Sequence, residues 1–231
     1  MTTPLNDLTV VSITFNNPGI YNTIESLKPL IDRGAQVLVQ NGGDTIAIEE
    51  KNLTIYNEED SGIYDGLNKG IKKVDTAYFM LLHAGDTYIG SADDLSIIID
   101  DLHNQTKHLS LNSQLIGKRV HSSRFWKPWM LALGTQPPHL PCVYRSSKFK
   151  SHTYSTAIPV IADFDFFYQQ DTWDSYINHN KLLVQMEPGG KTSGGFGSFI
   201  LVSQHFVIHY GIRGLIMATC RFPFKLLQTF L

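Results

Sequence analysis

The stretch that decides the fold class is Ala77-Tyr78-Phe79-Met80-Leu81-Leu82, which runs directly into His83-Ala84-Gly85-Asp86. A run of apolar residues without alternation predicts a central strand covered on both faces, as in a parallel α/β sheet. Ligands bind such sheets just beyond the carboxyl ends of the strands. Asp86 therefore stands where a carboxylate can meet a metal or a substrate. The alternative is an Asp that forms a turn or caps the next helix.

The rest of the first half alternates strand and helix signals. We predict strands at 8–15, 37–40 and 53–56, a helix through about residue 28 and a helix with an apolar stripe at 63–74. Asp60 or Ser61 can cap that second helix, whose N-terminus also favours phosphate. The resulting β-α-β-β-α-β order predicts a doubly wound sheet with its functional loops on one edge.

The second half is less regular. The loop 125–141 is rich in aromatic residues and proline and has the character of an acceptor-recognition loop. The Gly-rich stretch 189–197 is either a mobile lid or a linker. Between and around them we predict helices at 91–103 and 161–170 and strands at 115–120 and 182–186.

Length and composition favour one α/β domain. The chain has 231 residues, a net charge of -2 and a pI near 6.5, which argues against a nucleic-acid partner. Two distant cysteines fit a reducing compartment. The N-terminus does not resemble a signal peptide, and we find no strongly apolar, uncharged run of 18 residues, so we expect a cytoplasmic protein that does not span the membrane.

The charges are unevenly distributed along the chain. Residues 1–187 hold all 21 acidic residues, whereas the last 44 residues carry four basic residues and no acid. We therefore separate a catalytic domain, 1–195, from an apolar and basic helical tail, 196–231. Such a tail can lie on anionic lipid. The alternative is a helix pair that packs on the domain or on a second subunit of a homo-oligomer.

A longer motif resembles a known family. The segment Glu59-Asp60-Ser61-Gly62-Ile63-Tyr64-Asp65-Gly66-Leu67-Asn68-Lys69-Gly70-Ile71, with the Ala-Gly-Asp turn after it, resembles bacterial family 2 glycosyltransferases of the polysaccharide, O-antigen and colanic-acid type. Those enzymes show a "D-x-G-I-Y-D-A-M-N-K-G-I" helix start and an "N-x-G-D" variant of the metal-binding D-x-D motif. Weaker matches extend the resemblance over roughly residues 8–190, at Thr14-Phe15-Asn16, at Pro138-His139 with Tyr144-Arg145, and at Ala162-Asp163-Phe164-Asp165.

The resemblance implies a GT-A-like, doubly wound mixed sheet flanked by helices, a nucleotide-sugar donor, a Mn or Mg ion and inversion at the anomeric carbon. Asp86 resembles the carboxylate that holds the metal, and a hard cation there would neutralise the leaving diphosphate. Asp163 resembles the general base for an acceptor hydroxyl whose pKa is far above 7. Asp165, two residues on, would point elsewhere on a helix.

Further residues match positions that contact the donor or the acceptor. For the residues of the acidic segment, the alternative is a solvated first turn with a capping Asp, and for the histidine it is a structural role. The expected contacts are Thr14, Asn16, Asp44, Asp60, Asp65, Asn68, Lys69 and His139.

Two departures from the family pattern affect the donor site. The turn after the second strand is Asn41-Gly42-Gly43-Asp44-Thr45 rather than a "D-G-x-S-x-D" run, so base recognition is lost or moved to Asp44. The identity of the nucleotide stays open. His83 replaces the usual Asn or Asp before the Gly-Asp pair, either as an indirect partner of the metal or as a weak ligand.

These observations predict an inverting, metal-dependent hexosyltransferase that extends a bacterial surface glycan such as lipopolysaccharide. Its acceptor would be a glycan or a lipid-linked saccharide at the inner face of the cytoplasmic membrane. The alternative is a catalytically silent sugar-nucleotide-binding or assembly protein with the same fold. The presence of both Asp86 and Asp163 favours the enzyme. A nucleotidyltransferase would need a Gly-rich phosphate loop with a basic residue after the first strand, and residues 16–19 do not supply it.

Overall fold

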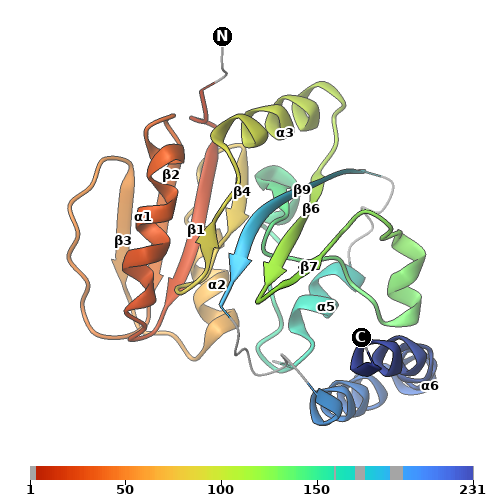
Figure 1. The fold of residues 1–231 in the computed structure, drawn as a ribbon. Coiled ribbons are helices and arrows are strands. Elements are labelled where there is room, and N and C mark those ends of the chain that lie inside the picture. The colour runs from red at the N-terminus through yellow and green to blue at the C-terminus, as the bar shows by residue number, and fades with distance from the viewer. Residues whose placement is uncertain (1–3, 159, 170–174, 188–194, 231) are drawn as a thin grey trace.

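The computed structural model describes residues 4–158, 160–169, 175–187 and 195–230, and within the last range the side chains of 199–221. The described strands form one nine-stranded mixed sheet in the order β3-β2-β1-β4-β8-β6-β9-β5, with β7 paired to β6 (Figure 1). The predicted α/β class with a mixed sheet flanked by helices is confirmed.

The first four strands of this sheet run parallel to one another, as predicted. They are β1 (Leu8–Thr14), β2 (Gln36–Asn41), β3 (Leu53–Asn57) and β4 (Tyr78–Leu81). All residues of β4 are buried, which confirms that the apolar stretch is a central strand. Because the four strands are parallel, their carboxyl ends lie at one edge of the sheet.

The other half of the sheet is mixed. Its strands are β5 (Thr87–Tyr88), β6 (Leu109–Ile116), β7 (Arg119–His121), β8 (Val143–Arg145) and β9 (Tyr176–Met186). The single strand predicted at 115–120 is wrong, because Gly117 has a positive φ of 58° and turns the chain from β6 back into β7. The strand predicted at 182–186 begins earlier, at Tyr176, because polar residues continue its pairing with β6.

Helices cover both faces of the sheet, and two apolar clusters form the core. One face is covered by α1 (Gly19–Ile31) and α3 (Ala92–Asn104), whose apolar residues pack on Val10, Val39 and Met80. On the other face, Val11, Phe79 and their neighbours pack against a second set of helices. That set contains α2 (Ile63–Lys72), α4 (Ser146–Phe149), α5 (Ala162–Tyr168), the 3-10 helix η1 (Pro128–Leu133) and α6 (Gly195–Phe230).

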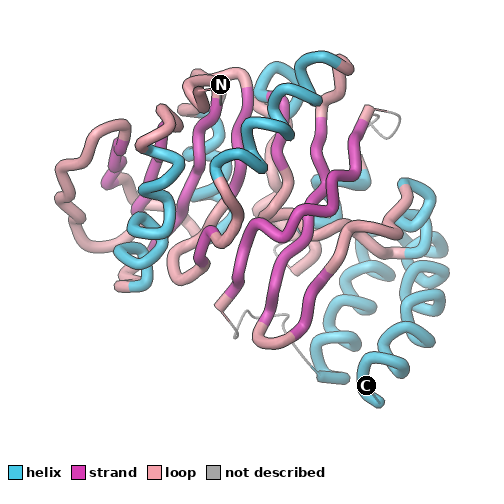
Figure 2. The backbone as a smooth tube through the Cα atoms, turned by 45° about the horizontal axis from the view of Figure 1, so that its top comes forward, coloured by secondary structure: helices cyan, strands magenta, loops and turns pink. Residues whose placement is uncertain are grey.

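The C-terminal element α6 is a hairpin of two helical arms, 195–210 and 212–230, that lie side by side (Figures 1 and 2). Gly211 breaks the helix with φ 57° and ψ -128°. The stretch Phe199–Arg221 has the length and mean hydropathy, 1.2, of a membrane span, but this break divides it. Phe206 and Met217 are buried in the core, so the tail packs on the domain with one side.

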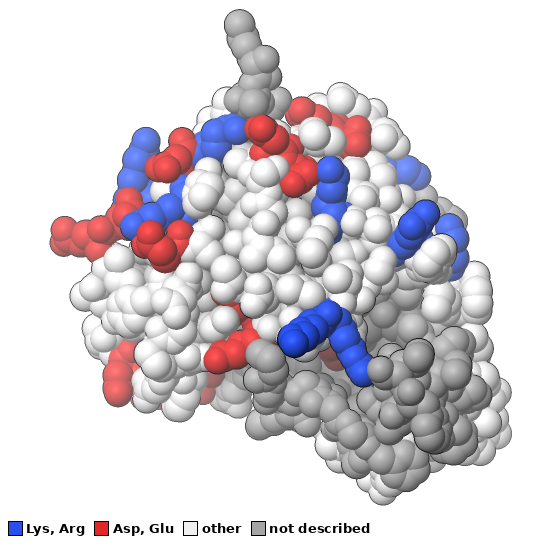
Figure 3. Space-filling model, viewed as in Figure 1, with Lys and Arg blue, Asp and Glu red and all other residues white. Residues whose placement is uncertain are grey.

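On the face of the molecule in Figure 3, acidic and basic side chains are interspersed along the upper and left edges, and the centre carries few charges. On the right side of this face, the charged side chains of the described part are basic. The Gly-rich stretch predicted at 189–197 falls mostly at 188–194, outside the described residues.

Candidate active site

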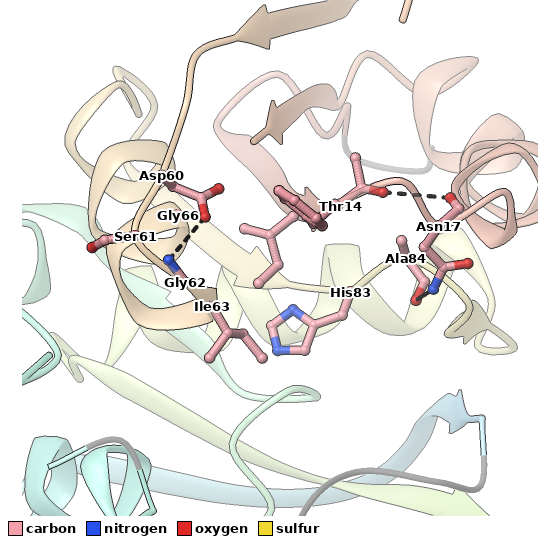
Figure 4. Close-up of a pocket in the computed structure, with 11 residues that line it drawn as sticks. Thr14, Asn17, Asp60, Ser61, Gly62, Ile63, Gly66, His83 and Ala84 are labelled. Carbon is pink, nitrogen blue, oxygen red and sulfur yellow. Dashed lines mark hydrogen bonds between the residues drawn. The ribbon is translucent and has the colours of Figure 1, made fainter. Parts of the chain in front are cut away.

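A pocket opens at the edge of the sheet where the parallel strands end (Figure 4). It has a volume of about 560 Å³ and lies between the end of β1, the start of α2 and the turn after β4. This is the edge at which ligands of open α/β sheets bind. The lining consists of Ile13, Thr14, Phe15, Asn17, Asp60, Ser61, Gly62, Ile63, Gly66, His83 and Ala84.

Four residues that the sequence predicted for the donor site lie at or beside one wall of the pocket, and two of them, Thr14 and Asp60, line it. The Asp60 carboxylate accepts a 3.0 Å hydrogen bond from the Gly62 N–H, and Thr14 lines the pocket beside β1 (Figure 4). Asn16 has a positive φ of 50°, and its Oδ1 accepts a 2.6 Å hydrogen bond from the Asp44 N–H. Three separate chain segments thus meet at this wall. Their contact with a nucleotide stays a prediction.

The other predicted residues of α2 bind the protein itself. Asp65 accepts a 2.8 Å hydrogen bond from the Ser61 N–H and pairs with Lys69 at 3.2 Å. The Ser61 N–H is the main cause of the lowered pKa of Asp65. Asn68 donates to the Tyr154 carbonyl at 2.9 Å and accepts from the Tyr154 N–H at 2.8 Å. These residues shape the entrance to α2, and a direct donor contact by them stays a prediction.

The start of α2 differs in detail from the expected cap. Gly62 is the N-cap, with φ 134°, and no side chain caps the helix. Asp60 bonds to the Gly62 N–H instead, outside the helix. The Asp60 carboxylate therefore makes no cap hydrogen bond to the first turn of α2 and points toward the pocket and Gly66 (Figure 4).

The turn after β4 is held by the start of α1. Gly85 has φ 95°, a conformation that favours glycine because it has no Cβ. A Cβ on Gly19 would lie 2.8 Å from the Gly85 Cα, so α1 packs directly on the turn. The Thr23 hydroxyl donates to the Asp86 carbonyl at 2.7 Å and accepts from the Gly85 N–H at 3.1 Å. The turn therefore presents Asp86 in a fixed position.

Asp86 is a buried carboxyl, 5% exposed, beside a second carboxyl that follows β9. Its Oδ1 accepts a 3.0 Å hydrogen bond from the Glu187 N–H. Burial raises the pKa of Asp86 to about 6, the Glu187 N–H opposes this rise, and the Glu187 carboxylate adds to it. Such a carboxylate gains stability from a nearby cation, which favours the ionised form.

The pair Asp86 and Glu187 fits a hard divalent ion such as Mn²⁺ or Mg²⁺, because both supply carboxylate oxygens. A Cβ on Gly85 would lie 2.3 Å from the Glu187 Oε2, so this carboxylate lies against the same turn. Within the described ranges, no group of three or more His, Cys, Asp or Glu could hold a metal ion. The residues thus suit an ion that completes its shell with ligand phosphates and waters, as Mg²⁺ usually does.

Two histidines connect the pocket to Asp163. His83 lines the pocket, and its Nδ1 is buried without a hydrogen-bond partner among the described residues. Its ring centroid lies 6.1 Å from that of His139, whose Nδ1 lies 3.8 Å from the Asp163 Oδ2. Burial lowers the pKa of His83 to about 3. Burial also lowers the pKa of His139, although the nearby Asp163 carboxylate acts to raise it. Both rings are therefore neutral near pH 7.

Asp163 lies in the first turn of α5, as predicted. Its Oδ1 accepts a 3.0 Å hydrogen bond from the Phe164 N–H, and its Oδ2 accepts one of 2.6 Å from Gln136. The side chain keeps 24% of its surface exposed, so a ligand can reach it. Two donors fix the carboxylate while leaving it accessible, which is what a general base requires.

Asp165 has a different environment, as the sequence predicted. It is 5% exposed and accepts hydrogen bonds from Gln169, at 2.6 Å, and from the Tyr210 hydroxyl on α6. This buried carboxyl ties α5 to the C-terminal hairpin. Of the two neighbouring acids, Asp163 is the one that a ligand can reach, and its role as the base stays a prediction.

Sequence reasoning missed Glu187 and Gln136. Glu187 directly follows a predicted strand, just as Asp86 follows β4. This position could have identified it as a second carboxylate at the edge of the sheet. No sequence pattern identifies Gln136 as a partner of Asp163, because the two residues are 27 positions apart and Gln136 lies in an irregular loop.

Comparison with solved structures shows where this fold recurs. Residues 1–349 of S. aureus TarS, in complex with UDP-GlcNAc, match with a TM-score of 0.66 at 13% identity over 94% of this chain and 73% of that chain. The mannosyltransferase PcManGT from Pyrobaculum calidifontis, in complex with GDP-Man and Mn²⁺, matches with a TM-score of 0.59 at 13% identity over 93% and 69%. The chain has a GT-A-like fold.

At these low identities the likeness establishes the fold alone. Against a longer S. aureus TarS chain the match covers 40% of that chain. Neither a family model nor a curated protein sequence matches this chain.

Proposed function

We propose that the protein is an inverting, metal-dependent glycosyltransferase that moves a hexosyl group from a nucleotide-diphosphate sugar to a saccharide acceptor. One observation carries the proposal. His83 lines the pocket at the carboxyl edge of the sheet, and His139 lies between His83 and the partly exposed carboxylate of Asp163. A donor site and a base for the acceptor thus adjoin each other, as sugar transfer requires. The solved neighbours with UDP-GlcNAc and with GDP-Man and Mn²⁺ support a nucleotide-sugar donor.

The donor half of the site has the groups that a nucleoside diphosphate needs. Asp60 lines the pocket and Asp44 is bonded to Asn16 beside it, so we assign the nucleoside to these two residues. Asp86 closes the turn that follows the lining residues His83 and Ala84, and together with Glu187 it would meet the diphosphate. A divalent ion bound there would neutralise the charge that the diphosphate gains as the glycosidic bond breaks. Neutral His83 can donate a hydrogen bond to a phosphate oxygen from inside the pocket.

The acceptor half needs a base on the side away from the leaving diphosphate. Asp163 would accept the proton of the acceptor hydroxyl as its oxygen attacks the anomeric carbon, and the Gln136 amide holds the carboxylate in place. A single base opposite the leaving group produces inversion. We infer that the product has the anomeric configuration opposite to that of the donor.

We further propose that the acceptor is lipid-linked and that the protein lies on the inner face of the cytoplasmic membrane, where it extends a surface glycan such as lipopolysaccharide. The support is an apolar tail surface on α6 next to the exposed Arg213. Apolar and basic side chains together suit anionic lipid. The apolar tail surface consists of Ile200, Leu201, Val207, Ile208, Ile212, Leu215 and Ile216, each between 39% and 80% exposed.

The membrane proposal is tested by sedimentation with anionic vesicles. Replacing both Ile208 and Ile212 by Ser should release the protein, whereas Ile97→Ser, which alters an exposed isoleucine on α3, should not. Binding should weaken as salt rises, because the basic contribution is screened. Equal sedimentation of all three proteins would refute the proposal. Truncation is a poorer test, because Phe206 and Met217 belong to the core.

The transferase proposal is tested by incubating the protein with a panel of UDP- and GDP-sugars and Mn²⁺ and measuring the nucleoside diphosphate released. We expect release from at least one donor, loss of release with EDTA, and loss in Asp86→Asn. NMR of a transferred sugar would report inversion. A protein that binds a nucleotide sugar but never releases the diphosphate, with or without acceptors, would instead be a silent binding protein.

A further inference from the structure

The second arm of α6 carries a basic residue on the side that faces the catalytic domain. The Arg221 guanidinium lies over the ring of Phe206, with its Cζ 5.2 Å from the ring centroid. Phe206 is fully buried, and its ring meets that of Phe164 edge-on at 4.7 Å. Because Phe164 directly follows Asp163, this stack places Arg221 beside the helix that bears the proposed base.

A second contact places Arg221 beside the loop that holds this base. Gly134 has φ 73°, and a Cβ there would lie 3.0 Å from the Arg221 Cδ and 3.1 Å from the Met217 Cβ. Two residues further on, Gln136 donates its hydrogen bond to Asp163. The loop from Gly134 to Gln136 therefore lies between the C-terminal hairpin and the acceptor half of the site.

Arg221 is half-buried, and within the described part of the chain no carboxylate forms a salt bridge with it. Burial lowers its pKa, and the Asp163 carboxylate is close enough to oppose this effect. A cation withdrawn from water without a partner is unfavourable. Its planar guanidinium can bind two phosphate oxygens at once, which makes arginine a preferred phosphate ligand.

We propose that Arg221 binds a phosphate group of the acceptor, close to the sugar that is extended. This inference rests on the proposed transferase function and specifies its acceptor class as a phosphorylated saccharide. The phosphate would come from a diphosphate that links the saccharide to its lipid, or from a phosphate within the glycan itself. In either case the C-terminal hairpin completes the acceptor site, and its outer face can dock on lipid.

The probes for this site are farnesyl diphosphate, inorganic pyrophosphate and farnesol, with UDP, GDP and Mn²⁺ present to fill the donor site. Titration calorimetry should show that the native protein binds farnesyl diphosphate and that Arg221→Gln weakens this binding about 10- to 100-fold. Arg119→Gln alters an exposed arginine on β7 and should bind as the native protein does. Tight pyrophosphate binding indicates a glycan phosphate, and binding of farnesyl diphosphate alone indicates a lipid source.

Equal affinity of the native protein and Arg221→Gln for both phosphorylated probes would overturn the inference, and so would farnesol binding as tightly as farnesyl diphosphate. If Arg221→Gln does not fold, the native protein still gives an answer. Its arginine Nε–Hε signals in ¹⁵N NMR, assigned with Arg221→Lys, should show a shift at residue 221 on adding farnesyl diphosphate. Failure of the transferase proposal is recognised separately, because the native protein would then release no nucleoside diphosphate from any donor.

Discussion

Replacing Asp86 by Asn should stabilise the metal-free protein while it abolishes metal-dependent donor binding. The native carboxyl is 5% exposed, and its pKa rises from 3.8 to about 6 mainly through burial. That difference corresponds to about 3 kcal/mol. Asn is neutral, has nearly the same shape and can still accept the 3.0 Å hydrogen bond from the Glu187 N–H.

The sign of the pH dependence follows from the raised pKa. Well below pH 3.8 the Asp86 carboxyl is protonated in both the folded and the unfolded chain, so its burial does not destabilise the fold. Between about pH 4 and 6 the destabilisation grows, because the carboxyl ionises in the unfolded chain while it stays protonated in the folded one. As pH rises through about 6, the folded state must hold a buried charge, and the native protein loses up to about 3 kcal/mol relative to Asp86→Asn. For a chain of this length, that corresponds to a difference in Tm of about 6–12 °C at pH 8.

The assay is urea unfolding in EDTA at pH 4.5 and pH 8, followed by circular dichroism. Asp75→Asn, which alters an exposed carboxyl, serves as the matched control and should change little at either pH. Adding Mn²⁺ should stabilise the native protein but not Asp86→Asn. If Asp86→Asn were no more stable than the native protein at pH 8, the argument that this carboxyl is held buried for a cation would be refuted.

Three further substitutions test other parts of the site. Asp163→Asn should lower turnover about 10²- to 10⁴-fold with donor KM little changed, and equal loss in Asp165→Asn with Asp163→Asn active would reverse the two roles. Tyr210→Phe removes a hydrogen bond to the buried Asp165 and should lower the free energy of unfolding by about 1–3 kcal/mol in urea titrations; an unchanged value would mean that α6 is not held there. Asn68→Ala should cost about 2 kcal/mol through its two bonds to Tyr154, and a rise in donor KM without this loss would assign it to the donor instead.

The sequence predicted the parallel half of the sheet well, because its signals are local. The uninterrupted apolar residues of β4 could only be covered on both faces, and the turn to Asp86 had to follow at the carboxyl edge. The sequence predicted only the end of β9, at 182–186. Its first residues are polar, and Asn178, His179 and Asn180 bond to serine side chains rather than show apolar alternation.

Contacts between distant segments were beyond sequence reasoning. The approach of Gln136 to Asp163 and of Glu187 to Asp86 depends on how irregular loops return to the sheet edge. The tail posed a different problem, because its apolar residues occupy several sides of the helix. Only the break at Gly211 decides which of them pack on the domain, such as Phe206, and which remain exposed.

The central claim is that the pocket at the carboxyl edge binds the nucleoside diphosphate of a donor together with a divalent ion. Titration calorimetry with UDP and GDP, with and without Mn²⁺, tests it directly. Ile63 is 52% exposed and points into the pocket, so Ile63→Trp fills it, whereas Lys72→Trp alters the exposed end of the same helix (Figure 4). We predict that Mn²⁺ strengthens binding of one nucleotide and that Ile63→Trp, but not Lys72→Trp, weakens it at least about tenfold, which is 1.4 kcal/mol. Binding of neither nucleotide, or equal binding by all three proteins, would contradict the claim.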